Sequence, residues 1–290
     1  MHVRIVRGAV RSAAFAASVI GTLIWAQSAA TTPSGSLAHT GADTIPWVVV
    51  GIGVLAVAQG GSSRPFARGY RAPVAMTRRH IDMAIHQFAA AAERAAADGF
   101  RLLELHAGHG RLLHSFLYPV ANRRTDRYGD GFTGLTLLLR RTVRAVRAVR
   151  AVWPGELLLA VGLSATDFVA GGWTLKDTVR LVPLLAEDGA DLIDCTSGGI
   201  TRPEPRPTGP AWQAPHAAAV RRATGVSTAA VGKITTVAQA DRLLTEEQCD
   251  VALMGRQLLI EPMERQYTDG HSVHARRLDV QVGSPSARGG

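Results

Sequence analysis

The sequence is poor in cysteine, in aromatic residues and in lysine, and each shortage excludes a class of protein. Among its 290 residues the cysteines are Cys195 and Cys249, too few for a disulfide framework or a multi-cysteine metal site. Aromatic residues make up 6% of the chain, so the net charge of +9 comes without stacking platforms or a known nucleic-acid module. We therefore expect packed or incidental thiols, no bound metal and no specific nucleic-acid partner.

The positive charge comes almost entirely from arginine. The densest run contains Arg140, Arg141, Arg144, Arg147 and Arg150, interleaved with valines at a helical spacing. Basic chains attract polyanions without specificity, so the charge alone assigns no partner. The spacing indicates a solvated helix face.

The chain also lacks an apolar run long enough to cross a bilayer, which takes about 20 residues. The run over 45–58 is too short and favours a buried or irregular segment, so we expect no membrane span. Near the N-terminus, arginines precede the apolar residues 13–25 and small residues follow, a layout typical of a secretory signal. Gly21 interrupts that run, and we expect a cytoplasmic protein, with export through this leader as the alternative.

Short apolar strands alternate with amphipathic helices through the middle of the chain. The first expected helix begins after Thr77, its N-cap, and stops at Gly99. Further helices are expected over 135–152, 175–188, 215–224 and 237–245, and strands over 102–106, 157–163, 191–195, 228–232 and 251–254. Apolar strands connected by helices predict a parallel sheet covered on both faces, either a barrel or a doubly wound sheet.

Polar residues and glycines follow the C-terminal ends of successive strands, where (β/α)8 barrels build their active sites. They are His106 and His109, Ser164 and Asp167, Ser197–Gly199, Gly232, and Gly255 with Arg256. This placement predicts a (β/α)8 TIM barrel. The barrel is expected to be incomplete at its N-terminus, because the first 75 residues supply too few convincing strands. Residues 1–35 form an unmatched segment, and 264–290 are expected to form a flexible tail.

Two imidazoles three residues apart, just after a strand, can both donate to one carbonyl oxygen. They would stabilise the negative charge that develops there during a reduction, which makes His106 and His109 the candidate catalytic residues. The alternative is that His106 is a core histidine and His109 an exposed one. A zinc site completed by His114 lacks a carboxylate or thiolate at a convincing place.

The last two strands end in residues suited to a phosphate. Gly232, Gly255 and Arg256 offer backbone N–H groups and a guanidinium where such barrels usually bind one. Ordinary strand-ending turns would explain the glycines but less well the arginine.

The longest motif is ELHAGHGRLLHSFLYPVANRRTDRYG, from Glu104 to Gly129. With its His-x-x-His and Asn-x-Arg-x-Asp-x-Tyr-Gly patterns, it resembles the central segment of the Old Yellow Enzyme family. The later strands of that family are matched in order by LSATD (163–167), DLIDCTSGG (191–199), AVGKIT (230–235) and MGRQLLIEP (254–262). No match is found before Ser36, so the resemblance implies a barrel domain over 36–263.

The resemblance implies an FMN-dependent NAD(P)H oxidoreductase of the ene-reductase type. In that family hydride passes from nicotinamide to flavin N5 and then to the β-carbon of an α,β-unsaturated carbonyl compound, here held by His106 and His109. The strand-end positions indicate the residues that would hold the cofactor phosphate and ribityl chain, namely Ser197, Gly198, Gly199, Gly232, Gly255 and Arg256. The expected partner is a small enone-type substrate, and the oligomeric state is left open, a homo-oligomer included.

Several positions depart from the family pattern. Arg111 replaces the tyrosine thought to protonate the substrate, and Gly162 replaces the arginine that faces the flavin ring. An arginine is always charged and cannot act as a general acid. A rival hypothesis is therefore a catalytically inactive, truncated barrel that serves as a binding or interaction protein or is a gene relic. A non-flavin reaction on a sugar phosphate is a third reading, but it lacks a strand-end Schiff-base lysine, since Lys233 follows a glycine and Lys176 lies in a helix.

Overall fold

The computed structural model describes residues 24–25, 47–50, 59–61, 73–98, 100, 102–150, 158–200 and 207–255. Three features predicted from the sequence lie outside these residues. They are most of the segment 1–35, the tail 264–290 and the phosphate-binding candidate Arg256.

A seven-stranded sheet forms the centre of the described structure. In spatial order its strands are β1 (Ile24–Trp25), β2 (Trp47–Val50), β5 (Leu102–Ala107), β6 (Leu158–Ser164), β7 (Leu192–Thr196), β8 (Thr228–Ala230) and β9 (Val251–Ala252). Neighbours from β2 to β9 pair in parallel, whereas β1 pairs with β2 antiparallel. A separate parallel pair joins β3 (Gln59–Gly60) to β4 (Val74–Ala75). The predicted parallel sheet is confirmed, and β2 is a strand within the apolar run 45–58, for which the sequence favours a buried or irregular segment.

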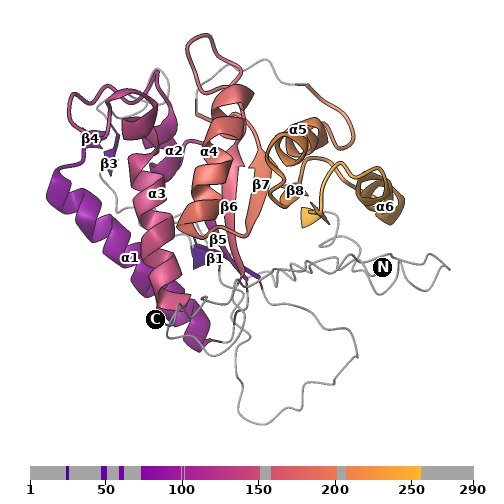
Figure 1. Cartoon of the computed structure of the whole chain (residues 1–290), viewed down its shortest axis with the longest axis horizontal. Helices are drawn as coiled ribbons and strands as arrows, with labels where there is room; N and C mark the ends of the chain where they lie inside the picture. The colour runs from indigo at the N-terminus through magenta and orange to yellow at the C-terminus, as the bar shows by residue number, and fades with distance from the viewer. Residues whose placement is uncertain are drawn as a thin grey trace, which may run out of the picture.

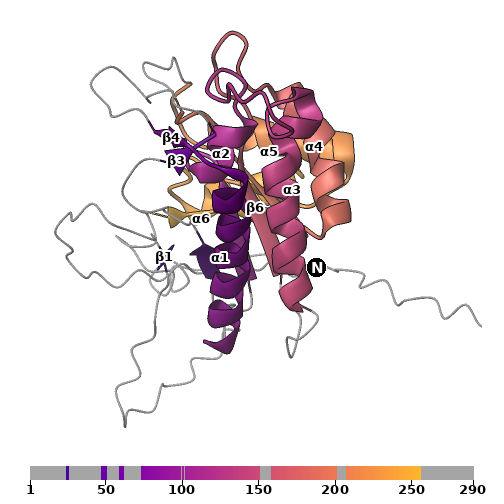
Figure 2. The same cartoon turned by 90° about the vertical axis from the view of Figure 1, so that its left-hand side faces the viewer.

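Helices connect the parallel strands and cover one side of the sheet. They are α1 (Arg78–Ala97), α2 (Leu112–Leu117), α3 (Gly131–Arg150), α4 (Leu175–Asp188), α5 (Ala214–Thr224) and α6 (Val237–Thr245). Helix α1 packs on α3, α3 on α4 and α4 on α5, and α1 and α3 lie side by side in both views (Figures 1 and 2). None of the described helices is long and apolar enough to cross a membrane.

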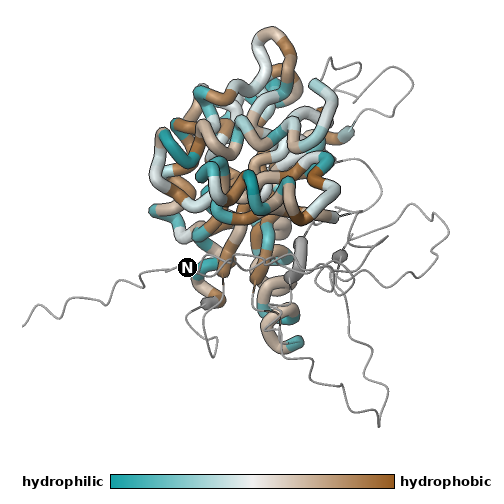
Figure 3. The backbone as a smooth tube through the Cα atoms, turned by 90° about the vertical axis from the view of Figure 1, so that its right-hand side faces the viewer, coloured by the Kyte–Doolittle hydropathy of each residue, from teal (hydrophilic) through white to brown (hydrophobic). Residues whose placement is uncertain are grey.

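Side chains alternate between two faces along each strand, as the period of two in a β-strand requires. Leu103, Leu105 and Ala107 of β5 belong to the large core shared with the helices. A smaller apolar cluster on the opposite face contains Leu102, Ala160, Leu192, Ala229 and Val251. Figure 3 shows hydrophobic and hydrophilic residues interspersed along the described backbone.

Local sequence signals fix most of the helix ends. Helix α1 begins as predicted at Thr77, whose hydroxyl accepts a hydrogen bond from the His80 amide over 3.2 Å. Helix α3 begins at residue 131, four residues before the predicted start at 135, and the short helix α2 was not predicted. Helix α2 lies within the long motif, and α3 begins shortly after the last residue of that motif, Gly129.

The Asn-x-Arg-x-Asp-x-Tyr part of that motif acts as a structural clip. The Arg124 guanidinium binds both carboxylate oxygens of Asp126, over 2.9 and 2.7 Å, and donates to the Met76 carbonyl over 2.8 Å. The Asn122 amide donates to the carbonyls of Phe116 and Tyr128, each over 2.8 Å. The guanidinium lowers the pKa of the Asp126 carboxyl through its hydrogen bonds. These contacts tie the loop after α2 to the segment that enters α1.

The arginine run lies on α3, but it is more than a solvated face. Arg140 and Arg144 bind the buried Asp188 of α4 over 2.6 and 2.8 Å. Arg141 pairs with Asp82 of α1 over 2.9 Å and contacts the Tyr128 hydroxyl. These ion pairs join α3 to both neighbouring helices, so part of the run is committed to packing within the fold.

We predict that Asp188→Asn destabilises the fold, because the neutral amide leaves two guanidinium groups without their shared anion. The arginines are partly exposed, so the expected loss is about 1–2 kcal/mol in the free energy of unfolding. Urea denaturation followed by circular dichroism measures it. Asp98→Asn, at the exposed end of α1, is the matched control and should change little; equal effects in the two variants would contradict the assigned role of Asp188.

Candidate functional site

Two histidines stand at the C-terminal end of β5, as the sequence predicted. His106 is the fifth residue of the strand and has a side chain 19% exposed, while His109 lies exposed in the loop that follows. The rings lie side by side, with centroids 5.1 Å apart. His106 Nε2 and His109 Nδ1 are 3.0 Å apart and share one hydrogen bond. Both rings can donate to one carbonyl oxygen only after that bond opens.

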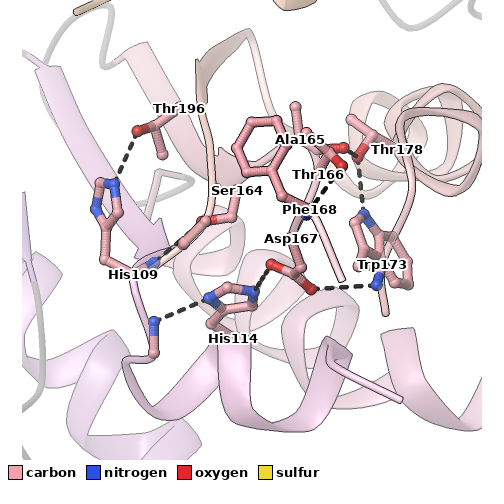
Figure 4. Close-up of polar contacts among 12 residues, drawn as sticks. His109, His114, Ser164, Ala165, Thr166, Asp167, Phe168, Trp173, Thr178 and Thr196 are labelled. Carbon is pink, nitrogen blue, oxygen red and sulfur yellow. Dashed lines mark hydrogen bonds and ion pairs between the residues drawn. The ribbon is translucent and has the colours of Figure 1, made fainter. Parts of the chain in front are cut away.

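The histidine pair belongs to a longer line of hydrogen bonds. At its inner end, Glu104 Oε1 lies 3.2 Å from His106 Nδ1. At its outer end, His109 Nε2 lies 2.8 Å from the Thr196 hydroxyl at the end of β7 (Figure 4). Thr196 donates to Gln213 Oε1 over 3.1 Å, and Ser197 donates to the same oxygen over 2.7 Å. The line thus runs from a buried carboxylate through both imidazoles to the residues that precede α5.

A second network holds the loop that carries His109. His114 and Asp167 are fully buried and 3.0 Å apart, and Asp167 also accepts from the Trp173 amide over 3.2 Å. The Gly110 amide donates to His114 Nδ1 over 2.9 Å, so the proton of a neutral His114 ring lies on Nε2, facing Asp167. Figure 4 shows His114 turned toward Asp167 and away from His109. Because Gly110 and Asp167 bind its two ring nitrogens, His114 does not complete a three-histidine zinc site.

Beneath the histidines, two carboxyl groups flank Gly162 of β6. Gly162 pairs with His106 on one side and with Asp194 on the other. A Cβ at position 162 would lie 2.5 Å from Glu104 Oε1 and 2.9 Å from His106 Nδ1, so glycine lets these side chains fold over the strand. Asp194 is 7% exposed, and its Oδ1 has no hydrogen-bond partner in the part of the chain that the structure describes. Burial and the nearby Glu104 charge raise the pKa of Asp194 well above its ordinary value.

The structure places the predicted phosphate residues at the ends of adjacent strands. Gly232 follows β8, Gly255 follows β9, and these two strands are hydrogen-bonded neighbours. Gly232 has φ of 110°, and a Cβ there would lie 2.8 Å from Gln213 Nε2, whereas a Cβ at Gly255 would meet open space. The third member of this group, Arg256, lies outside the described residues.

The Ser197–Gly199 loop is placed beside the histidines but is largely engaged within the protein. The Gly198 amide donates to the Thr166 carbonyl over 2.8 Å, and the Ser197 hydroxyl is bound to Gln213. Gly199 has φ of 88°, and a Cβ there would lie 2.7 Å from the His109 Cα. The loop therefore packs against the backbone of His109, in addition to any contact that it makes with a ligand.

Both cysteines are buried, in agreement with the sequence prediction of packed thiols. Burial raises the pKa of the Cys249 thiol to about 12 and moves that of Cys195 well above its ordinary value. Neither thiol supplies a thiolate near neutral pH, so the candidate chemistry rests on the histidines.

Sequence reasoning missed four residues that the structure adds to the site: Glu104, Asp194, Thr196 and Gln213. Glu104 could have been found by strand alternation, since it stands two residues before His106 and so shares its face. The same spacing relates Asp194 to Thr196 on β7. No comparable signal marks Gln213, because only the packing of α5 against β7 brings it to Thr196.

The chain matches known proteins over most of its described part. Residues 56–267 match the model of the NADH:flavin oxidoreductase / NADH oxidase family. An NADPH dehydrogenase of Listeria innocua is 38% identical over 201 residues, which cover 69% of this chain and 58% of that protein. An NADPH dehydrogenase of Bacillus velezensis is 34% identical over 224 residues, covering 77% of this chain and 63% of that protein. The chain thus spans less than two thirds of the length of these relatives.

Solved structures with a similar fold include two reductases. A complex of 2-naphthoyl-CoA reductase is similar with a TM-score of 0.66 at 20% identity, covering 74% of this chain and 34% of that one. Morphinone reductase is similar with a TM-score of 0.58 at 18% identity, covering 76% of this chain and 65% of that one. Together with the family match, these similarities confirm the predicted fold class, the (β/α)8 barrel.

We predict that Asp194→Asn stabilises the protein at neutral pH. A carboxyl group with a raised pKa binds its proton more tightly in the folded state than in the unfolded chain. The free energy of unfolding therefore falls as the pH rises from about 4, the unfolded pKa, toward the raised folded value. The variant loses this decline, so its melting temperature should exceed that of the wild type at pH 7–8 and approach it near pH 4. Melting curves across this range make the test, with the exposed Asp130→Asn as control, and identical pH slopes in variant and wild type would refute it.

Proposed function

Because the chain belongs to the NADH:flavin oxidoreductase / NADH oxidase family, we propose that it is an FMN-dependent NAD(P)H oxidoreductase acting on the activated C=C bond of α,β-unsaturated carbonyl compounds. The observation that carries this proposal is the imidazole pair at the C-terminal end of β5. It opens at the same end of the sheet as the glycines that follow β8 and β9.

The phosphate end of the site fits FMN. Gly232 and Gly255 stand at neighbouring strand ends, and within the described residues the Gly232 amide donates to no carbonyl. Backbone N–H groups at this end of a barrel commonly bind a phosphate. We assign the phosphate to these glycines with Arg256, and the ribityl chain to the Ser197–Gly199 loop. When bound there, FMN would supply hydride transfer between the nicotinamide and the substrate.

The imidazole pair binds the substrate carbonyl. Once the bond between the rings opens, His106 Nε2 and a nitrogen of His109 donate to the carbonyl oxygen, where negative charge develops as the hydride arrives. The Ser164 hydroxyl accepts from the His109 amide over 3.1 Å and holds this loop in place. Arg111 is exposed at the start of α2 and, being always charged, donates no proton.

The first experiment is the visible absorbance spectrum of the purified protein after incubation with FMN and removal of free ligand. We expect a retained flavin band near one equivalent. A spectrum without flavin would count against the oxidoreductase and favour the alternative, an inactive barrel that serves as a binding protein.

A variant pair locates the phosphate. Gly232→Ala places a methyl group against Gln213 at φ of 110°, so we expect FMN to bind about tenfold more weakly, measured by quenching of flavin fluorescence. Gly225→Ala has a comparable φ of 70° but lies at the end of α5 with open space around it. It should bind FMN like the wild type, and equal weakening in both variants would refute the assignment.

A second pair tests the histidines. His106→Ala and His109→Ala should each lower kcat for the NADPH-dependent reduction of cyclohexenone by about 10²-fold or more, since each removes a donor to the developing oxyanion. Flavin retention should be unchanged. Full turnover in both variants would exclude the proposed carbonyl site.

A further inference from the structure

The line of hydrogen bonds from Glu104 to Gln213 fixes how many protons the site holds. The line is closed to solvent at Glu104, whose side chain is 5% exposed, and it is open to solvent at His109. Each link uses one proton, so the number of links can be compared with the number of protons that the groups supply.

At the Gln213 end, the amide oxygen determines which groups of the line donate a hydrogen bond. Gln213 Oε1 can only accept, and it receives hydrogen bonds from both Ser197 and Thr196. A threonine hydroxyl has a single proton, and Thr196 donates it to Gln213. The 2.8 Å contact between Thr196 and His109 Nε2 therefore needs its proton from the ring, which makes His109 Nε2 a donor.

The inner end sets a second condition. A Glu104 carboxylate can only accept, so the 3.2 Å contact requires a proton on His106 Nδ1. Between the rings, the 3.0 Å link requires a third proton, on either His106 Nε2 or His109 Nδ1. Two neutral imidazoles supply two protons for these three links. One of the two rings must be an imidazolium.

We propose that His106 and His109 share one extra proton, balanced by the Glu104 carboxylate, and that the pair is the proton donor of the reaction. Glu104, Thr196 and Gln213 are positioning residues that keep this proton in place. The inference deepens the proposed function and depends on it for the identity of the reaction, whereas the proton count depends on the three hydrogen bonds of the two rings.

The chemistry balances. Reduction of a C=C bond adds two electrons and two hydrogens: the hydride supplied by NAD(P)H forms the C–H bond at the β-carbon, and a proton from the imidazolium passes to the carbonyl oxygen that the pair binds. The resulting enol becomes the saturated carbonyl compound when its O–H bond breaks and a C–H bond forms at the α-carbon. The imidazolium N–H bond breaks and its electron pair stays on the ring. Two neutral imidazoles and the carboxylate remain, and water reprotonates the pair through the exposed His109.

The groups around the line favour a positive charge on it. From β5 comes Glu104, and from β7 the buried Asp194, which acts on Glu104 electrostatically. Strand β6 contributes Gly162 and Ser164, and α5 contributes Gln213. An imidazole is a stronger base than a carboxylate, which places the proton on the rings.

The test counts ring protons by ¹⁵N NMR on protein labelled with ring-¹⁵N histidine, without flavin. Single His106→Asn and His109→Asn variants assign the signals. At pH 7 we expect three protonated nitrogens among the four of this pair. Two neutral rings in the wild type would overturn the proposal.

A matched pair of variants tests the cause. Gln213→Leu removes the acceptor, so the Thr196 hydroxyl turns to donate to His109 and the third ring proton should disappear at pH 7. Gln213→Glu keeps an acceptor in place and should retain three. Equal proton counts in these two variants would refute the role of Gln213.

Glu104→Gln tests the charge balance in the same way. The neutral amide should lower the pH at which the third ring proton is lost, and in flavin-loaded protein it should shift the acidic-to-neutral pH profile of kcat downward while flavin retention stays constant. An unchanged NMR titration would remove Glu104 from the proposal. Because the NMR measurement needs neither flavin nor turnover, loss of FMN binding would sink the proposed function without affecting the proton count.

Discussion

The alternation of side chains along a parallel strand is the constraint on which the rest of the structure depends. One face of β5, β6 and β7 packs under the helices and is apolar, so every polar group of these strands is confined to the other face. There the parallel register aligns His106 with Gly162 and Asp194. The site is thus a direct consequence of strand register, and its loops only complete it.

Gly162 decides the character of the interior beneath the site. Without a side chain it leaves two carboxyl groups facing each other across β6, and among the described residues no cation is bonded to Asp194. An isolated charge in such a place is costly, and the raised pKa of Asp194 is the response. Glu104, in contrast, forms a hydrogen bond with His106, which couples the buried charge to the imidazole pair.

Two loops that are distant in sequence give the histidine pair its geometry. The buried pair of His114 and Asp167 anchors the loop after β5 to the loop after β6, and Gly199 lies against the backbone of His109. A buried, fully bonded network of this kind is rigid. The exposed His109 is therefore held in a fixed orientation, which a residue that binds a carbonyl or delivers a proton requires.

The sequence by itself determined the parallel α/β architecture, most helix bounds and the histidine pair, because apolar periodicity, caps and strand-end positions are local signals. It also carried the motif on which the family resemblance rests. It did not determine that the two imidazoles bond to each other, that Gln213 orients Thr196, or that Asp194 Oδ1, beside Gly162, has no hydrogen-bond partner among the described residues. Those features depend on contacts between β5, β6, β7 and α5. Only the tertiary structure decides them, because hydrogen-bond direction and burial depend on which groups meet in space, and the order of residues along the chain does not specify this.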